Sequence, residues 1–172
     1  MVDDLTEKTQ ASLGKLEALM ARIPGVGGYQ QKEKRRDADK LLRLHIARLL
    51  EEQMNRLSDV QVALTMQGRL DVTLILERAS TKLQLLIDRL KTASYGYSGF
   101  FDAVKVKEEE LDKLYRFDEQ MLDSLDELSV ALTELAEEID SEEPIMTRAN
   151  ALVRQIEGLN STYSKRQDVL LV

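Results

Sequence analysis

The strongest constraint on the fold is a repeat of apolar residues between positions 111 and 139. The steps between them alternate between three and four residues, and only Asp118 interrupts the series. This spacing keeps the side chains on one face of an α-helix and is typical of coiled coils and helical bundles. The repeat therefore predicts a long helix, from about residue 107 to 140, that packs against other helices. Its apolar members are Leu111, Leu114, Met121, Leu125, Leu128, Leu132, Leu135 and Ile139.

The rest of the chain also has helical periodicity. Residues 3–22 carry one narrow apolar seam, which ends before Pro24 because proline disfavours helical geometry in the residue before it. Residues 31–67 have a wide apolar face, which indicates contact with two or more neighbouring helices. Residues 72–93 and the stretch that follows Ser141 repeat the pattern.

Two short interruptions separate these helices. Gly68 fits the end of one helix and Asp71 the capping position of the next, and we favour this break over one continuous helix from 31 to 93. Ser141 and Pro144 are typical of a helix start. Because so few residues join the last two helices, we expect them to form an antiparallel hairpin.

These patterns predict an all-α protein, an antiparallel, coiled-coil-like bundle of four to five helices. We expect an N-terminal amphipathic helix (1–23), a glycine-rich hinge (24–30) and the bundle itself (31–172). The hinge contains Gly25, Gly27 and Gly28, but no Lys-Ser or Lys-Thr pair follows them, so we do not interpret it as a phosphate-binding loop.

A glycine- and aromatic-rich loop separates the third and fourth expected helices. Its four aromatic residues are half of those in the chain. Buried, they would plug one end of the bundle; exposed, they would form a binding surface. These residues are Tyr95, Tyr97, Phe100 and Phe101.

Charge is unevenly distributed along the chain, whose formal net charge is −7. Residues 30–50 carry seven basic and three acidic side chains, whereas residues 107–143 carry three basic and fifteen acidic ones. The two segments would attract each other as neighbouring helices, or one of them would meet a partner. Lys34, Arg35 and Arg36 form a basic helix start suited to an anionic membrane surface, whereas the overall charge opposes nucleic-acid binding.

Few residues suit catalysis or metal binding. The chain has no cysteine and a single histidine, His45, which does not form a Glu-x-x-His pair. We interpret His45 as a packed residue, and no serine lies on a recognisable nucleophile elbow. We therefore expect no enzyme activity, no metal, no cofactor and no small-molecule substrate.

The function that we expect is that of a scaffold or adaptor acting through protein–protein association, including association with itself. Leu128 and Leu159, on the last two helices, are the candidate centre of the principal association surface, within one chain or between chains. The alternative is a peripheral membrane protein that binds lipid or remodels membranes. The acidic N-terminus and the lack of long apolar runs favour a cytoplasmic protein.

Overall fold

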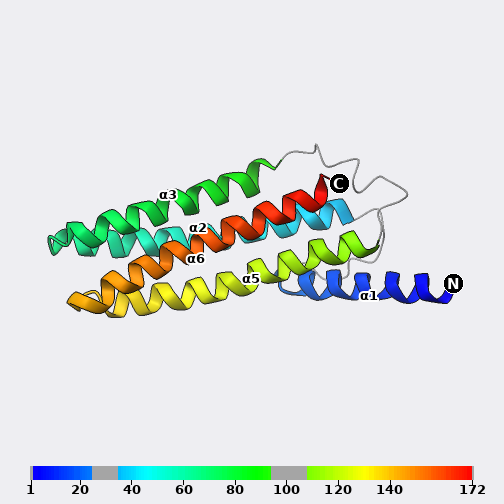
Figure 1. Ribbon diagram of the computed structural model, residues 1–172, viewed down its shortest axis with the longest axis horizontal. Coiled ribbons are helices and arrows are strands. Elements are labelled where there is room, and N and C mark those ends of the chain that lie inside the picture. The colour runs from blue at the N-terminus through cyan, green and yellow to red at the C-terminus, as the bar shows by residue number, and fades with distance from the viewer. Residues whose placement is uncertain (1, 25–34, 94–107, 172) are drawn as a thin grey trace.

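The computed structural model describes residues 2–24, 35–93 and 108–171, which are almost entirely helical and confirm the all-α prediction (Figure 1). Five helices lie within these residues, and no strand does. They are α1 (Val2–Ala21), α2 (Arg35–Met66), α3 (Leu70–Thr92), α5 (Glu108–Glu137) and α6 (Glu142–Leu170).

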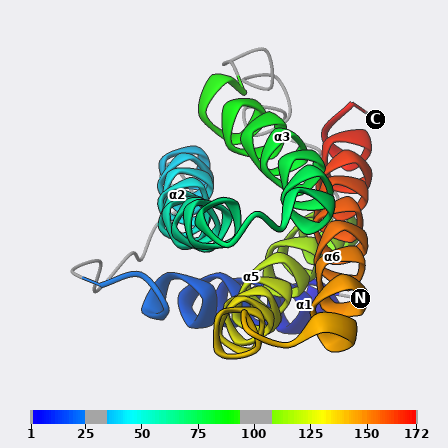
Figure 2. The ribbon, with the colours of Figure 1, turned by 90° about the vertical axis from the view of Figure 1, so that its left-hand side faces the viewer.

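Four of the helices form a rod, with the order α2, α3, α6, α5 around its axis (Figure 2). The hairpins α2–α3 and α5–α6 are each antiparallel, as expected. Across the hairpins, however, the neighbours are parallel: Lys82 of α3 pairs with Glu157 of α6 at 3.0 Å, and Arg89 of α3 bonds Ser164 of α6 at 3.0 Å. The parallel packing of α3 on α6 follows because α5, which runs opposite to both of them, lies diagonally across the rod from α3.

The apolar seams of the four helices meet in one continuous core. Leu50 and Leu64 of α2, Leu76 of α3, Leu135 of α5 and Ile156 of α6 are all fully buried within it. The wide apolar face of α2 is explained by its two main neighbours, α3 and α5.

A tight turn joins α2 to α3, as predicted at Gly68. Gly68 has φ 74°, a left-handed conformation that favours glycine. Its N–H donates to the carbonyl of Thr65 at 3.0 Å, and the N–H of Arg69 donates to that of Leu64 at 2.9 Å. These two bonds form a Schellman motif, which satisfies the last carbonyl groups of α2.

The expected side-chain caps are not formed. Asp71 was expected to cap α3, but the helix already begins at Leu70, with Arg69 at the capping position, so Asp71 lies in the first turn. Ser141 does occupy the capping position of α6, but its side chain makes no capping hydrogen bond. Pro144 lies in the first turn of α6, where proline is tolerated.

Helix α1 lies outside the rod and packs against α5, running in the same general direction but inclined to it (Figures 1 and 2). Lys15 pairs with Asp112 at 3.0 Å, and Arg22 pairs with Asp123 at 3.0 Å and with Asp126 at 3.1 Å. The apolar seam of its second half is buried in the common core, at Leu16, Leu19, Met20 and Ile23. The predicted hinge is not tested, because all of it except Pro24 lies outside the described residues.

Candidate interaction surface

Most of the predicted interaction residues lie where the structure gives no side-chain description. Tyr95, Tyr97, Phe100, Phe101 and Lys34 are outside the described residues. Both roles considered for the aromatic loop therefore remain predictions.

The basic helix start is only partly described. Arg35 and Arg36 form the first turn of α2, but their side chains are not among those described. Acidic residues of α5 pair with α1, as described above. Arg148 of α6 bonds Glu134 of α5 and Glu138, which follows the end of α5.

Leu128 and Leu159 are buried in the core of their own chain. Leu128 is 0% exposed and Leu159 is 2% exposed. The seams of α5 and α6 therefore serve to pack this bundle, and neither residue is available at the surface. Any association surface must be sought on another face.

Asp118, the interruption in the apolar repeat, belongs to a buried network of four charged side chains. Arg166 of α6 donates from Nε to Asp118 Oδ1 at 2.5 Å and from Nη2 to Asp118 Oδ2 at 3.2 Å, and Nη2 also bonds Asp39 of α2. Arg43 donates to the other Asp39 oxygen at 2.9 Å and to the carbonyl of Leu90, on α3, at 2.9 Å. The network thus joins all four helices of the rod.

The network is electrically balanced, with two carboxylates and two guanidinium groups. Burial acts to raise the pKa of Asp39, but the charges of Arg166 and Arg43 outweigh it and hold that pKa below its ordinary value. Burial raises the pKa of Asp118, against the opposing effect of Arg166. The charged groups of the network pair with one another, and the pairs connect different helices. We therefore infer that the network holds the helices in register.

His45 is packed as the sequence suggested. It is 8% exposed, and its Nδ1 lies 3.3 Å from Nη2 of Arg48. Burial and, after it, the charge of Arg48 lower the pKa of His45. Among the described residues, no group of three or more His, Cys, Asp or Glu side chains is placed to hold a metal ion.

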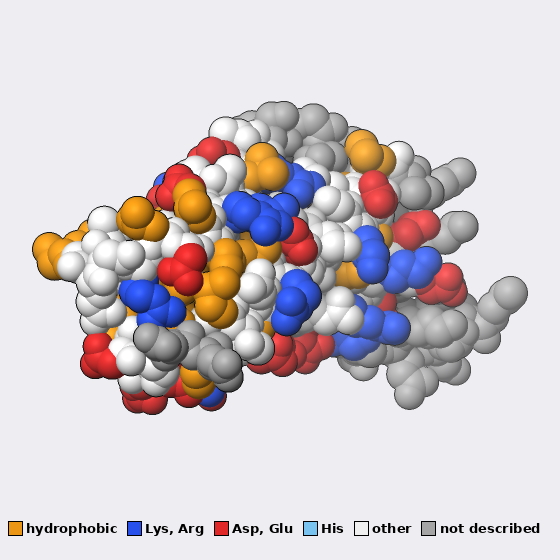
Figure 3. Space-filling view, turned by 60° about the vertical axis from the view of Figure 1, so that its left-hand side comes forward, with side chains coloured by type: hydrophobic (Ala, Val, Ile, Leu, Met, Phe, Trp, Pro, Cys, Tyr) orange, Lys and Arg blue, Asp and Glu red, His pale blue; other side chains and the backbone are white. Residues whose placement is uncertain are grey.

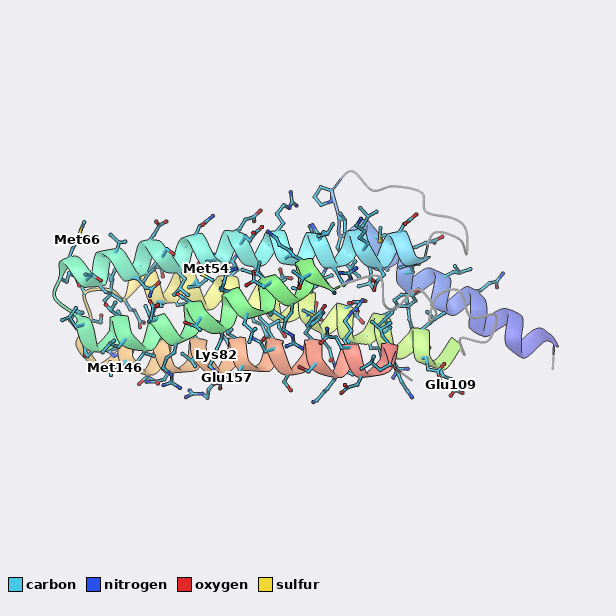
Figure 4. The ribbon with its side chains drawn as sticks, turned by 90° about the horizontal axis from the view of Figure 1, so that it is seen from above. Met54, Met66, Lys82, Glu109, Met146 and Glu157 are labelled. Carbon is cyan, nitrogen blue, oxygen red and sulfur yellow. The ribbon has the colours of Figure 1, made fainter. Side chains whose placement is uncertain are left out.

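An exposed apolar surface lies on the α2–α3 hairpin. Five large apolar side chains there are more than half exposed, and we call them the α2–α3 apolar surface. Four of them lie within six residues of the turn at Gly68, and Leu85 lies farther along α3. Exposed apolar side chains appear in Figure 3 as separate spots, and Met66 marks this end of the rod in Figure 4. The five are Val62 (54%), Met66 (84%), Leu70 (61%), Leu74 (69%) and Leu85 (55%).

The sequence contained a signal for this surface. The core repeat of α3 includes Leu76 and Leu86, and the apolar runs around each of them also include Leu74 and Leu85. One helix face cannot accommodate every residue of such a run, so one member must point away from the core.

Comparisons with protein-family models, with curated proteins and with solved structures found no match to this chain. In the described part of the chain, no helix is both long enough and apolar enough to cross a membrane.

Proposed function

We propose that this protein is a non-catalytic helical interaction module, a scaffold or adaptor that binds other protein chains through the α2–α3 apolar surface. The observation that carries the proposal is the exposure of Leu70, Leu74 and Leu85 on one helix. Burying one such side chain contributes roughly 1.5–3 kcal/mol, so a partner that covers several of them gains substantial binding energy. Exposed apolar side chains that gather in this way mark interaction sites in many proteins.

The buried polar groups support a non-catalytic function. Asp39, Arg43, Asp118 and Arg166 bond one another, and their links join the helices of the rod. In the same way, Arg56 of α2 bonds the Ser129 hydroxyl of α5 at 2.8 Å. Groups committed to helix packing in this way support a structural role for the rod.

The test compares Leu74→Glu/Leu85→Glu with a matched control, Val130→Glu. Val130 is 58% exposed but lies on α5, away from the α2–α3 apolar surface. Each protein is used as bait in affinity capture from its source cells and is run in sedimentation velocity over a concentration series. We expect wild type and Val130→Glu to capture the same proteins and to show the same degree of self-association. Leu74→Glu/Leu85→Glu should lose the captured proteins and any self-association seen in wild type.

The result that would overturn the proposal is identical behaviour of all three proteins in both assays. Circular dichroism confirms that the variants remain helical. The membrane alternative is addressed by co-sedimentation with vesicles of phosphatidylcholine and phosphatidylserine. Binding that survives Leu74→Glu/Leu85→Glu but falls steeply with salt would favour the basic helix start as a lipid site instead.

A further inference from the structure

The exposed face of α3 presents a row of six side chains directed away from the bundle core. They are spaced by four, three, four, three and four residues, which keeps them on one face of the helix, and all six are exposed. Two are leucines, two are threonines, and the remaining two carry opposite charges. The six residues, which we call the α3 stripe, are Leu74, Arg78, Thr81, Leu85, Asp88 and Thr92.

We propose that the α3 stripe pairs with the same stripe of a second copy of this chain, antiparallel, about a two-fold axis at the level of residue 83. This inference rests on the proposed function and names its partner. A two-fold interface requires a surface that is complementary to itself. The α3 stripe meets this requirement in both charge and size.

Charge complementarity comes from Arg78 and Asp88, which are equally distant from residue 83. In the antiparallel pair, Arg78 of each copy faces Asp88 of the other, so that the interface gains two ion pairs of opposite sign. Within the described residues Arg78 has neither a hydrogen bond nor an ion pair, and the Asp88 carboxylate accepts a bond only from Gln84, at 2.8 Å. Both charges are therefore free to pair across the axis.

Size complementarity comes from the leucines and threonines of the α3 stripe. In the same pairing Leu85 faces Thr81 at the centre, and Leu74 faces Thr92 at each end. A large side chain opposite a small one allows two helices to approach closely, because the layers interdigitate. Each leucine of the stripe thus faces a threonine of the second copy.

The charges also select this register over its neighbour. Moving the axis by half a heptad toward the start of α3 would place Leu74 opposite Leu85. It would also bring Asp88 of each copy opposite Asp71 of the other, and like charges at facing positions are unfavourable. We therefore place the axis at residue 83.

The stripe runs from Leu74 to Thr92, nineteen residues or about 27 Å of helix. A single pair of helices of this length buries less area than a standard protein interface, so the dimer should be weak and reversible. Sedimentation equilibrium between micromolar and millimolar protein is the appropriate measurement. Arg78→Asp and Asp88→Arg should each raise the dimer dissociation constant by about tenfold, since each puts like charges together twice.

The deciding variant is the charge swap Arg78→Asp/Asp88→Arg. It restores both ion pairs in reverse order and should return the dissociation constant to within about threefold of wild type. The matched control is Arg154→Asp, which changes an exposed arginine of α6 and should leave the constant unchanged. A charge swap as weak as the single variants would overturn the proposed register.

The absence of cysteine in the chain permits an independent test of direction. A nitroxide attached to Thr92→Cys should lie about 29 Å from its counterpart in the antiparallel dimer, from 27 Å along the axis and about 10 Å between helices. A parallel pairing would bring the two labels to about 10 Å. A spin–spin distance near 10 Å would therefore overturn the proposal.

Failure of this inference can be distinguished from failure of the proposed function. A protein that is monomeric at every concentration, but captures a partner through Leu74 and Leu85, would refute self-pairing and leave the interaction module standing. If Leu74→Glu/Leu85→Glu also captures the same proteins as wild type, both are wrong.

Discussion

Replacing Asp118 by leucine should destabilise the protein, although leucine would complete the apolar repeat of α5. The Asp118 side chain is 2% exposed and that of Arg166 is 1% exposed. Asp118→Leu leaves Arg166 only one carboxylate, that of Asp39, which it shares with Arg43. The buried network then carries an uncompensated positive charge.

Breaking a buried ion pair by removing one partner costs about 3–5 kcal/mol. For a chain of this length, each kcal/mol lowers the melting temperature by about 2–4 °C, so a fall of roughly 6–20 °C is expected. Removing both partners with Asp118→Leu/Arg166→Met leaves Asp39 paired with Arg43, which should recover more than half of the loss. Urea unfolding followed by far-ultraviolet circular dichroism compares Asp118→Leu, Arg166→Met and the double variant with wild type.

The control is Glu127→Leu, an exposed acid-to-leucine change on the same helix, which should alter stability by less than about 0.5 kcal/mol. If Asp118→Leu is at least as stable as wild type, the buried pair contributes nothing and the reasoning is refuted. Strict additivity of the Asp118 and Arg166 effects in the double variant would also refute it, because coupled charges cannot act independently.

Two other predictions concern Asp39 and Gly68. The folded-state pKa of Asp39 lies below its ordinary value, so its contribution to stability is present above pH 4 and is lost as the pH falls through the folded-state value. Asp39→Asn should therefore reduce the loss of unfolding free energy at low pH, measured by urea unfolding between pH 2 and 7. A pH dependence identical to that of wild type would contradict this prediction. Gly68→Ala should cost about 1–2 kcal/mol because of the left-handed backbone, whereas Gly158→Ala, inside α6 with open space around it, should be neutral or stabilising; equal thermal shifts for the two would disprove the turn geometry.

Helix positions and their core faces could be predicted from the sequence because local periodicity determines them. The repeat that contains Leu128, the break at Gly68 and the hairpin after Ser141 all depend on residues close in the chain. The prediction that Asp71 caps α3 was wrong, because a turn stabilised by Gly68 leaves little need for a side-chain cap. Capping residues act through bonds of a single turn, and neighbouring geometry readily replaces them.

The buried network and the exposed α3 stripe were beyond sequence reasoning for a different reason. Asp118 was visible as an interruption, but its partner Arg166 is 48 residues away and Asp39 is farther still. Nothing local indicates which helices become neighbours, and parallel packing of α3 on α6 was not anticipated. The outward position of Leu74 likewise depends on which helix faces are covered.

The arrangement of the helices gives the rod two unlike ends. The start of α2, the end of α3, the start of α5 and the end of α6 all lie together, at the end that also holds the buried charge network (Figure 1). Within the described ranges, the opposite end is formed by the tight turns α2–α3 and α5–α6. A partner bound near the first end would therefore lie about 45 Å from the exposed Met66, at the other end of the helical rod. Two molecules joined antiparallel along α3 would then form a spacer whose two attachment ends point in opposite directions.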